Sequence, residues 1–285
     1  MAQSFDLHMH TTYCDGRDSA EDMVLAAIGM GLETVGISGH SFTPHDESYC
    51  MSREKTEAYL DELKGLKEKY AGRIRVLTGL EMDLYADTDT SRLDYMIGSV
   101  HYMFTDEGLA KLEAGQPVEK LHDWTPVDDG TDELEAFAAN NGLGMMSLAE
   151  IYYRSVARIV AVTDCDVIGH FDLVTKFCDI YPLFDTEDPR YVRAWKDAAD
   201  RIFEDCAGRY KRGYRNRLEK SGLIEAGDKP VFEINYGAIS KGYRKTPYPA
   251  QDQMDYIRAK GGLLICSSDS HRTEDVGSFL RELKK

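Results

Sequence analysis

Seven short apolar runs alternate along the chain with longer stretches in which apolar positions recur at helical spacing. The runs predict strands at Phe5–His10, Thr34–His40, Arg75–Asp83, Asp94–Met103, Asp166–Asp172, Pro230–Tyr236 and Gly262–Asp269. The longer stretches predict helices over residues 20–30, from a cap at Ser52 to Gly72, and over 131–162, 189–221 and 249–260. Strands that alternate with helices predict a parallel sheet.

The fold that these elements favour is an α/β barrel, closed or nearly closed. A chain of 285 residues is close to the length of about 250 that such barrels usually have. No internal repeat or linker interrupts the pattern, so we expect one domain over residues 1–285. The acidic stretch Thr105–Glu135 is interpreted as an excursion above the barrel.

Charge and composition limit the classes of molecule that the protein is expected to bind. The net charge is −16, from 50 acidic and 34 basic residues, which argues against nucleic acid as a partner. A small anionic substrate is still compatible with this net charge, because bound metal ions can make the electrostatic potential around them positive. The start of the chain has no signal-peptide pattern and no run is long enough to span a membrane. Six scattered cysteines are typical of reduced thiols, so we expect a cytoplasmic protein; the oligomeric state is left open.

Six of the eight histidines fall at or just beyond the carboxyl end of a predicted strand. They are His8, His10, His40, His101, His170 and His271, and the carboxylates Glu81 and Asp269 occupy equivalent positions. A single histidine at such a position is more often an ordinary hydrogen-bonded residue than a ligand. Strand ends converge at one face of a barrel, however, and imidazole with carboxylate suits zinc, iron or manganese better than calcium. The pattern therefore predicts a metal site at the carboxyl-terminal face of the strands, while His45 and His122 are expected at the surface.

With these residues assembled, the sequence resembles the PHP (polymerase and histidinol phosphatase) superfamily, and more narrowly its histidinol-phosphatase branch. The matching motifs are His8-x-His10, Gly39-His40, Ser99-Val100-His101 and Asp269-Ser270-His271, with Glu81 and Gly169-His170 beside them. The branch is indicated by Cys14-Asp15-Gly16, by Glu233-Ile234-Asn235 and by Tyr248-Pro249.

The resemblance implies a distorted (β/α)7 barrel, similar to a TIM barrel, with a trinuclear centre of divalent ions. One ion would be held by His8, His10, Glu81 and Asp269. A second would use Glu81 with His101 and His170, and a third Asp15 with His40 and His271. Asp15 stands where many relatives carry histidine, so the identity of the third metal stays open. The ions expected are zinc, iron or manganese.

The chemistry expected is hydrolysis of a phosphate monoester by a metal-bridging hydroxide. Glu81 and Asp269 would hold the ions that ionise this water. The leaving alkoxide would take a proton from a metal-bound water or from His45. Arginine suits phosphate, so Arg244 with Lys241 nearby is the first choice for binding the phosphoryl group. Arg154 and Arg158 are the second choice.

The leading function is therefore hydrolysis of L-histidinol phosphate to histidinol and phosphate, a step of histidine biosynthesis. One alternative keeps the chemistry with another small phosphomonoester, a nucleotide or a phosphotyrosyl protein. The other alternative is a metal-binding module without catalysis.

Overall fold

The computed structural model describes residues 3–282 and contains a sheet of seven parallel strands. All seven predicted strands are confirmed. Along the sheet they are β1 (Phe5–Asp6), β2 (Thr34–Ile37), β3 (Arg75–Asp83), β4 (Tyr95–Ser99), β7 (Val167–Ile168), β8 (Val231–Asn235) and β9 (Leu263–Ser267). The sheet order follows the chain order, as in a singly wound barrel rather than an open doubly wound sheet.

The two edges of this sheet come together and nearly close the barrel. Met9, just past β1, forms a parallel bridge with Ser270, just past β9. The amide of His10 donates to the carbonyl of Ser270 at 2.8 Å, and the amide of Ser270 donates to the carbonyl of His8 at 3.1 Å. The strands therefore form a distorted (β/α)7 barrel, as expected, and closure joins the first and last histidine motifs.

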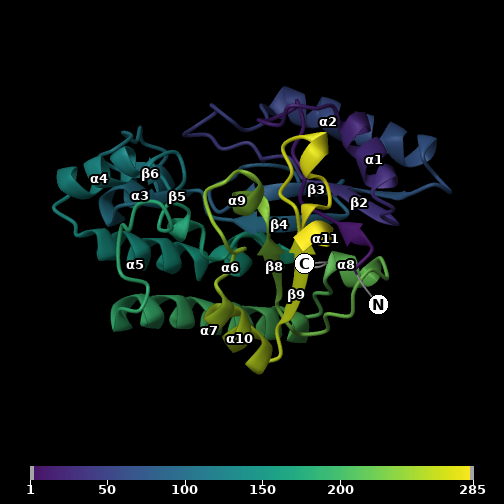
Figure 1. Ribbon diagram of the computed structural model, residues 1–285. Helices are drawn as coiled ribbons and strands as arrows, with labels where there is room; N and C mark the ends of the chain where they lie inside the picture. The colour runs from purple at the N-terminus through teal and green to yellow at the C-terminus, as the bar shows by residue number, and fades with distance from the viewer. Residues whose placement is uncertain (1–2, 283–285) are drawn as a thin grey trace.

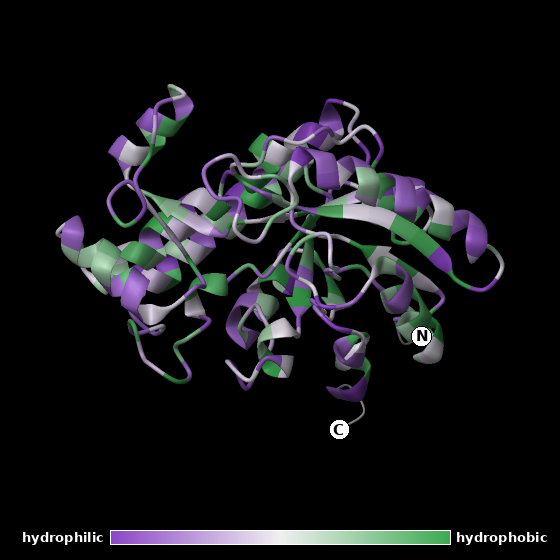
Figure 2. Cartoon of the chain, turned by 90° about the horizontal axis from the view of Figure 1, so that it is seen from above, coloured by the Kyte–Doolittle hydropathy of each residue, from purple (hydrophilic) through white to green (hydrophobic). Residues whose placement is uncertain are grey.

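Helices cover the outside of the barrel (Figure 1). They include α1 (Ala20–Gly29), α2 (Arg53–Lys69), α5 (Met145–Val156), α6 (Ile159–Thr163), α7 (Pro189–Lys211), α8 (Arg217–Lys220) and α10 (Gln251–Ala259). Both predicted caps form, since Ser19 Oγ accepts from the amide of Asp22 and Ser52 Oγ from that of Lys55. Figure 2 shows apolar residues concentrated along the central strands and polar ones on the outer helices.

Two stretches that were predicted to form single continuous helices are divided in the structure. The stretch 131–162 is divided into α4 (Thr131–Asn140), α5 and α6, and the break after α4 contains Gly142 with φ of +62°. The stretch 189–221 is divided into α7 and α8, with Gly213 at φ of +97° between them. Glycine adopts this left-handed conformation without a steric penalty, which ends each helix.

The excursion is present but carries more structure than expected. The predicted strand 94–103 ends at Ser99, and β5 (Tyr102–Phe104) leaves to pair antiparallel with β6 (Trp124–Pro126). Between them lies α3 (Asp106–Glu113), and the whole excursion lies beside the barrel at the left of Figure 1. Because β5 directly follows His101, this small sheet forms a wall next to one of the histidine motifs. Within residues 3–282 no helix is both long and apolar enough to cross a membrane.

Residues on alternate sides of the strands face the helices or the barrel interior, and the interior is filled around Tyr95. The Tyr95 side chain is fully buried and its hydroxyl donates to the carbonyl of Leu7, just past β1. It crosses directly over Gly79 of β3, where an added Cβ atom would lie 2.6 Å from Tyr95 Cε1. Glycine at this strand position therefore permits the close approach that fills the interior.

Substituting Gly79→Ala should destabilise the protein by about 1–3 kcal/mol, because the methyl group would displace Tyr95 from a close-packed interior. The free energy of unfolding in urea measures this. The matched control is Gly65→Ala on α2, where an added Cβ meets no atom within 4 Å. This variant should gain up to about 1 kcal/mol from helix propensity. Equal effects at the two positions would contradict this packing argument.

Candidate metal centre

The carboxylate of Glu81, near the end of β3, is the centre of the site. Five imidazoles surround it: those of His8, His10, His40, His101 and His170. Its Oε2 atom lies between 3.1 and 3.4 Å from a ring nitrogen of each of the first three. Its Oε1 atom lies 3.3 and 2.7 Å from Nε2 of the last two. Strand ends far apart in the sequence therefore converge on one carboxylate, as the sequence predicted.

Asp269, two residues past β9, completes one side of this cluster. Its Oδ1 atom lies 3.3 Å from His10 Nε2, 3.9 Å from His8 Nε2 and 3.6 Å from His271 Nδ1. The residue adopts φ of +50°, a left-handed conformation that costs energy for any residue with a Cβ atom and that clusters at functional sites. Gly237 accommodates it, since a Cβ there would lie 2.6 Å from Asp269 Oδ2.

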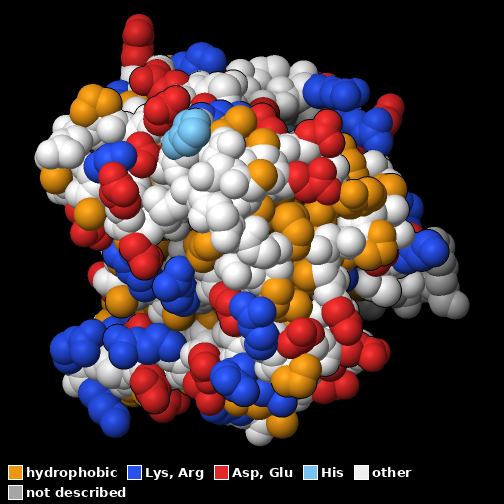
Figure 3. Space-filling view, turned by 90° about the vertical axis from the view of Figure 1, so that its left-hand side faces the viewer, with side chains coloured by type: hydrophobic (Ala, Val, Ile, Leu, Met, Phe, Trp, Pro, Cys, Tyr) orange, Lys and Arg blue, Asp and Glu red, His pale blue; other side chains and the backbone are white. Residues whose placement is uncertain are grey.

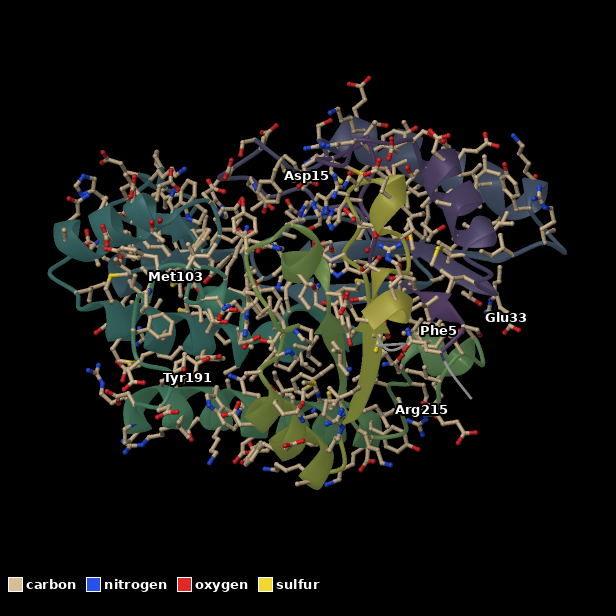
Figure 4. The ribbon with its side chains drawn as sticks, viewed as in Figure 1. Phe5, Asp15, Glu33, Met103, Tyr191 and Arg215 are labelled. Carbon is tan, nitrogen blue, oxygen red and sulfur yellow. The ribbon has the colours of Figure 1, made fainter. Side chains whose placement is uncertain are left out.

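A second group of donors gathers around Asp15, in the loop after β1. Asp15 Oδ2 lies 3.0 Å from His271 Nε2, and Oδ1 lies 3.4 Å from His10 Nδ1 and 3.7 Å from His40 Nε2. One donor atom from each of these four residues fits within 4.8 Å of the others. Asp15 is exposed at the top of the barrel in Figure 4, at the opposite end of the strands from Phe5.

The cluster is held by buried acceptors that the sequence analysis missed. Glu233 of β8 accepts from His8 Nδ1 at 2.6 Å, from the amide of His170 at 2.9 Å and from Asn235 Nδ2 at 2.9 Å. On β3, Asp83 accepts from the amide of His101 at 3.0 Å, with His101 Nδ1 3.3 Å away. Acceptors of this kind fix the orientation of ligating histidines. The available signal was a carboxylate in an otherwise apolar strand, as in Glu233-Ile234-Asn235.

The donor set fits divalent cations. His8 Nε2 and His10 Nε2 are buried and have no hydrogen-bond partner among the described residues, although Glu81 Oε2 lies 3.2 and 3.4 Å away. Nitrogens left unpaired beside an ionised carboxylate are expected where a cation binds between them. The buried cluster of imidazoles and carboxylates is thus a divalent-metal site.

The pKa values of three side chains in the cluster favour metal binding. Burial, reinforced by the neighbouring imidazoles, lowers the pKa of His10 to about 3. Burial also lowers the pKa of His40 to about 4. Burial acts to raise the pKa of Glu81, but His8 and the other imidazoles around it reverse this and hold that pKa well below its usual range. Neutral imidazole and ionised carboxylate are the forms that bind metal, so these three side chains are ready to bind. Burial acts to lower the pKa of His8 and that of His101, but Glu233 and Glu81 reverse this and raise both well above the usual value, so a bound cation would displace protons from these two rings.

A cavity of about 610 Å³ opens above the cluster. Besides the metal-binding side chains, its wall contains cationic residues and aromatic ones: Arg17, Lys176, Lys241, Arg272, Tyr49, Tyr102, Tyr243 and Tyr248. Of the predicted phosphate-binding residues, Lys241 lines this cavity, with Nζ 3.9 Å from Asp269 Oδ1. Lys176 was missed, because it lies on no strand end.

The predicted arginines lie elsewhere. Arg244 donates to Thr175 Oγ1 at 2.7 Å and to Asp172 Oδ2 at 3.3 Å, and it lines a separate cavity. Arg154 and Arg158 face α3, with Asp106 3.7 Å and Glu113 3.5 Å away. The helices α3 and α5 lie at the left of Figure 1, on the side that Figure 3 shows, where acidic and basic side chains are interspersed.

His45 is neither at the surface nor on the cavity wall. Its ring lies 4.4–6.1 Å, between centroids, from four aromatic rings: those of Tyr85, Tyr102, Phe104 and Trp124. Burial lowers its pKa. Surface placement was therefore wrong for His45 and is confirmed for His122, which is exposed. Asp172, two residues after His170, accepts from Arg244 and from the amide of Ala250.

Comparison with known proteins agrees with this geometry. The chain is 26% identical over 299 residues to the histidinol-phosphatase of Bacillus subtilis (strain 168), covering 96% of each protein. It is 32% identical over 107 residues to the DNA polymerase/3'-5' exonuclease PolX of the same organism, a match covering 35% of the chain and 18% of PolX.

Among solved structures, the fold is shared with histidinol phosphate phosphatase (HisK) from Lactococcus lactis subsp. lactis Il1403, complexed with zinc, L-histidinol and phosphate. The TM-score is 0.59 at 17% identity, over 99% of this chain and 91% of that one. A family model described as the PHP domain matches residues 6–213, from Asp6 on β1 past His170. The chain therefore belongs to the PHP domain family.

Proposed function

We propose that this chain is a metal-dependent phosphatase that hydrolyses L-histidinol phosphate to histidinol and phosphate. The observation that carries the proposal is the convergence of five imidazoles on Glu81 beneath a cavity lined by lysines. The relation to a histidinol-phosphatase over 96% of both chains supports the substrate. A metal-binding module without catalysis would not need an open cavity whose wall contains lysines.

We propose that the cluster holds three divalent ions, with zinc in first place because a HisK of the same fold binds zinc. His8, His10, Glu81 and Asp269 would hold the first, Glu81 with His101 and His170 the second, and Asp15 with His40 and His271 the third. When bound, such ions ionise a shared water near neutral pH and neutralise charge on the phosphoryl group. The distances to Glu81 and Asp15 support the places of His10, His170 and His271 in this division. His40 lies between two of the sets, 3.1 Å from Glu81 Oε2 and 3.7 Å from Asp15 Oδ1.

Two lysines of the cavity would bind the phosphoryl oxygens. Lys176 donates to the carbonyl and to Oδ2 of Asp128 at 2.8 and 2.9 Å, and its ammonium lies 4.9 Å from the centre of the Tyr243 ring. Burial acts to lower the pKa of Lys176, but Asp128 reverses this and raises it, so the side chain stays charged. Lys241 is half-exposed and reaches over Asp269. Both would orient the phosphate and stabilise the charge that develops on it.

The cavity wall also contains carboxylates and aromatic rings that suit a positively charged alcohol. Asp46 and Asp129 line it, together with the rings of Tyr49 and Tyr102, whereas Asp128 is already paired with Lys176. Histidinol carries an ammonium group and an imidazole, which carboxylates and aromatic rings bind well. Another phosphomonoester would need to match the same wall. The cytoplasmic location and the absence of nucleic-acid partners stay predictions.

Zinc-reconstituted protein should hydrolyse L-histidinol phosphate with a kcat/KM at least about 100-fold above those of p-nitrophenyl phosphate, AMP and phosphotyrosine, because only histidinol phosphate pairs the wall carboxylates. Release of phosphate measures the rates. Treatment with a chelator should abolish turnover on all four esters, and added zinc should restore it. Equal, slow rates on all four esters would contradict histidinol phosphate as the substrate. The assignment as a metal-dependent phosphatase would still stand.

Replacing Glu81→Ala should lower turnover on every substrate by about a thousandfold or more, because the bridge between the ions is lost. Zinc content, measured by atomic emission, should fall in parallel. Glu54→Ala on the exposed face of α2 is the matched control and should leave both unchanged. Undiminished activity of the Glu81 variant would rule out its central role.

The variant Lys241→Met should raise KM for the phosphomonoester about 10-fold or more, because one charged hydrogen bond to the phosphate is lost. Competitive inhibition by inorganic phosphate should weaken to the same degree. Lys245→Met, four residues along the same loop but outside the cavity lining, should change neither value. If the two variants behave alike, Lys241 does not bind the phosphate.

A further inference from the structure

The hydroxyl of Tyr248 is buried and has no hydrogen-bond partner among residues 3–282, although its residue lines the cavity above the metal centre. Only 2% of the side chain is exposed. Buried hydroxyl groups in proteins are almost always paired, so an unpaired one beside a ligand cavity points to a partner that the ligand brings.

Tyr248 is fixed against the end of β8, next to the metal ligands. Its amide donates to the carbonyl of Asn235 at 3.0 Å, and its carbonyl accepts from the amide of Asn235 at 2.7 Å. Asn235 Nδ2 in turn lies 3.2 Å from Asp269 Oδ2. The Tyr248 ring also meets the His170 ring edge to face, with centroids 6.4 Å apart. The phenol is therefore held by the same strand that orients the cluster.

Arg244 supports this ring instead of facing the phosphate. Its guanidinium lies 4.6 Å from the centre of the Tyr248 ring, and only 7% of its side chain is exposed. Thr175 and Asp172 hold it in place. It lines a second cavity, of about 850 Å³, while Tyr248 lines the first. A cation stacked on the ring stabilises negative charge on the phenol.

We propose that Tyr248 is the proton donor to the leaving alcohol, with Arg244 as its positioning residue; this rests on the proposed phosphatase function. As the bond between phosphorus and the ester oxygen breaks, its electron pair goes to that oxygen, which takes the phenolic proton. The phenolate then regains a proton from water in the cavity. Burial raises the pKa of Tyr248 well above its usual value, so the hydroxyl is protonated before the reaction. Transfer in this direction is favourable, because the alkoxide of an aliphatic alcohol is a far stronger base than a phenolate.

The alternative donor from the sequence does not reach this position. His45 is enclosed by aromatic rings and lies outside the cavity wall. Lys176 lines the cavity, but its ammonium is held by Asp128 and would serve the phosphate. Among the described residues that line the cavity, Tyr248 is thus the neutral donor that combines burial, a fixed ring and a free hydroxyl.

The test compares Tyr248→Phe with wild type on two esters, using zinc-reconstituted protein. L-Histidinol phosphate releases a strongly basic alkoxide, whereas p-nitrophenyl phosphate releases a stable anion that needs no proton. The variant should lose about 100-fold in kcat on the first ester and less than about threefold on the second. Tyr181→Phe, at an exposed tyrosine outside the cavity lining, is the matched control and should keep both rates. Zinc content should be equal in all three proteins.

Equal losses of Tyr248→Phe on both esters would overturn the proton-donor role and assign the hydroxyl to phosphate binding. No loss on L-histidinol phosphate would overturn it as well. A wild-type protein that hydrolyses neither ester would overturn the proposed function, and the inference with it. These outcomes are distinct, so failure of the donor role is separable from failure of the phosphatase function.

Discussion

The burial of one carboxylate, that of Glu81, is the constraint on which the rest of the structure depends. A carboxylate that is 1% exposed is strongly destabilising unless positive charge or hydrogen-bond donors compensate it. The compensation here is five imidazoles that follow four different strands, and each has to arrive with a ring nitrogen within 3.5 Å. The barrel meets this demand because parallel strands deliver their carboxyl ends to one face.

Closure of the barrel is part of the same constraint. His8 and His10 follow the first strand and Asp269 follows the last, and the hydrogen bonds between His10 and Ser270 hold these two edges together. Behind them, Glu233 orients His8 and fixes the backbone at His170, and Asp83 does the same for His101. The metal centre and the closed sheet are therefore one structural unit. Loss of either would weaken the other.

Charge inside the cavity is separated in a way that the overall charge of −16 conceals. Lys241 lies beside Asp269 of the metal cluster and Lys176 is paired with Asp128, whereas the carboxylates of Asp46 and Asp129 lie on the wall that includes the excursion. A substrate with a phosphate at one end and a cation at the other matches this division. The excursion thus has a direct part in the site, since β5 and β6 carry Tyr102 and Pro126 of its wall.

The pattern of the sequence predicted the seven strands, the barrel and the histidines and carboxylates that the structure gathers at one face. It could do so because strand periodicity is local and because histidines at strand ends are read directly from their position. Only the tertiary structure decided which charged side chains face the cavity. Arg244 was expected at the phosphate and instead supports Tyr248, while His45 is enclosed by four aromatic rings. Glu233 and Lys176 were not anticipated. The reason is physical: the direction of a loop side chain depends on partners distant in sequence, such as Asp172 and Asp128, whose proximity exists only after the barrel has formed.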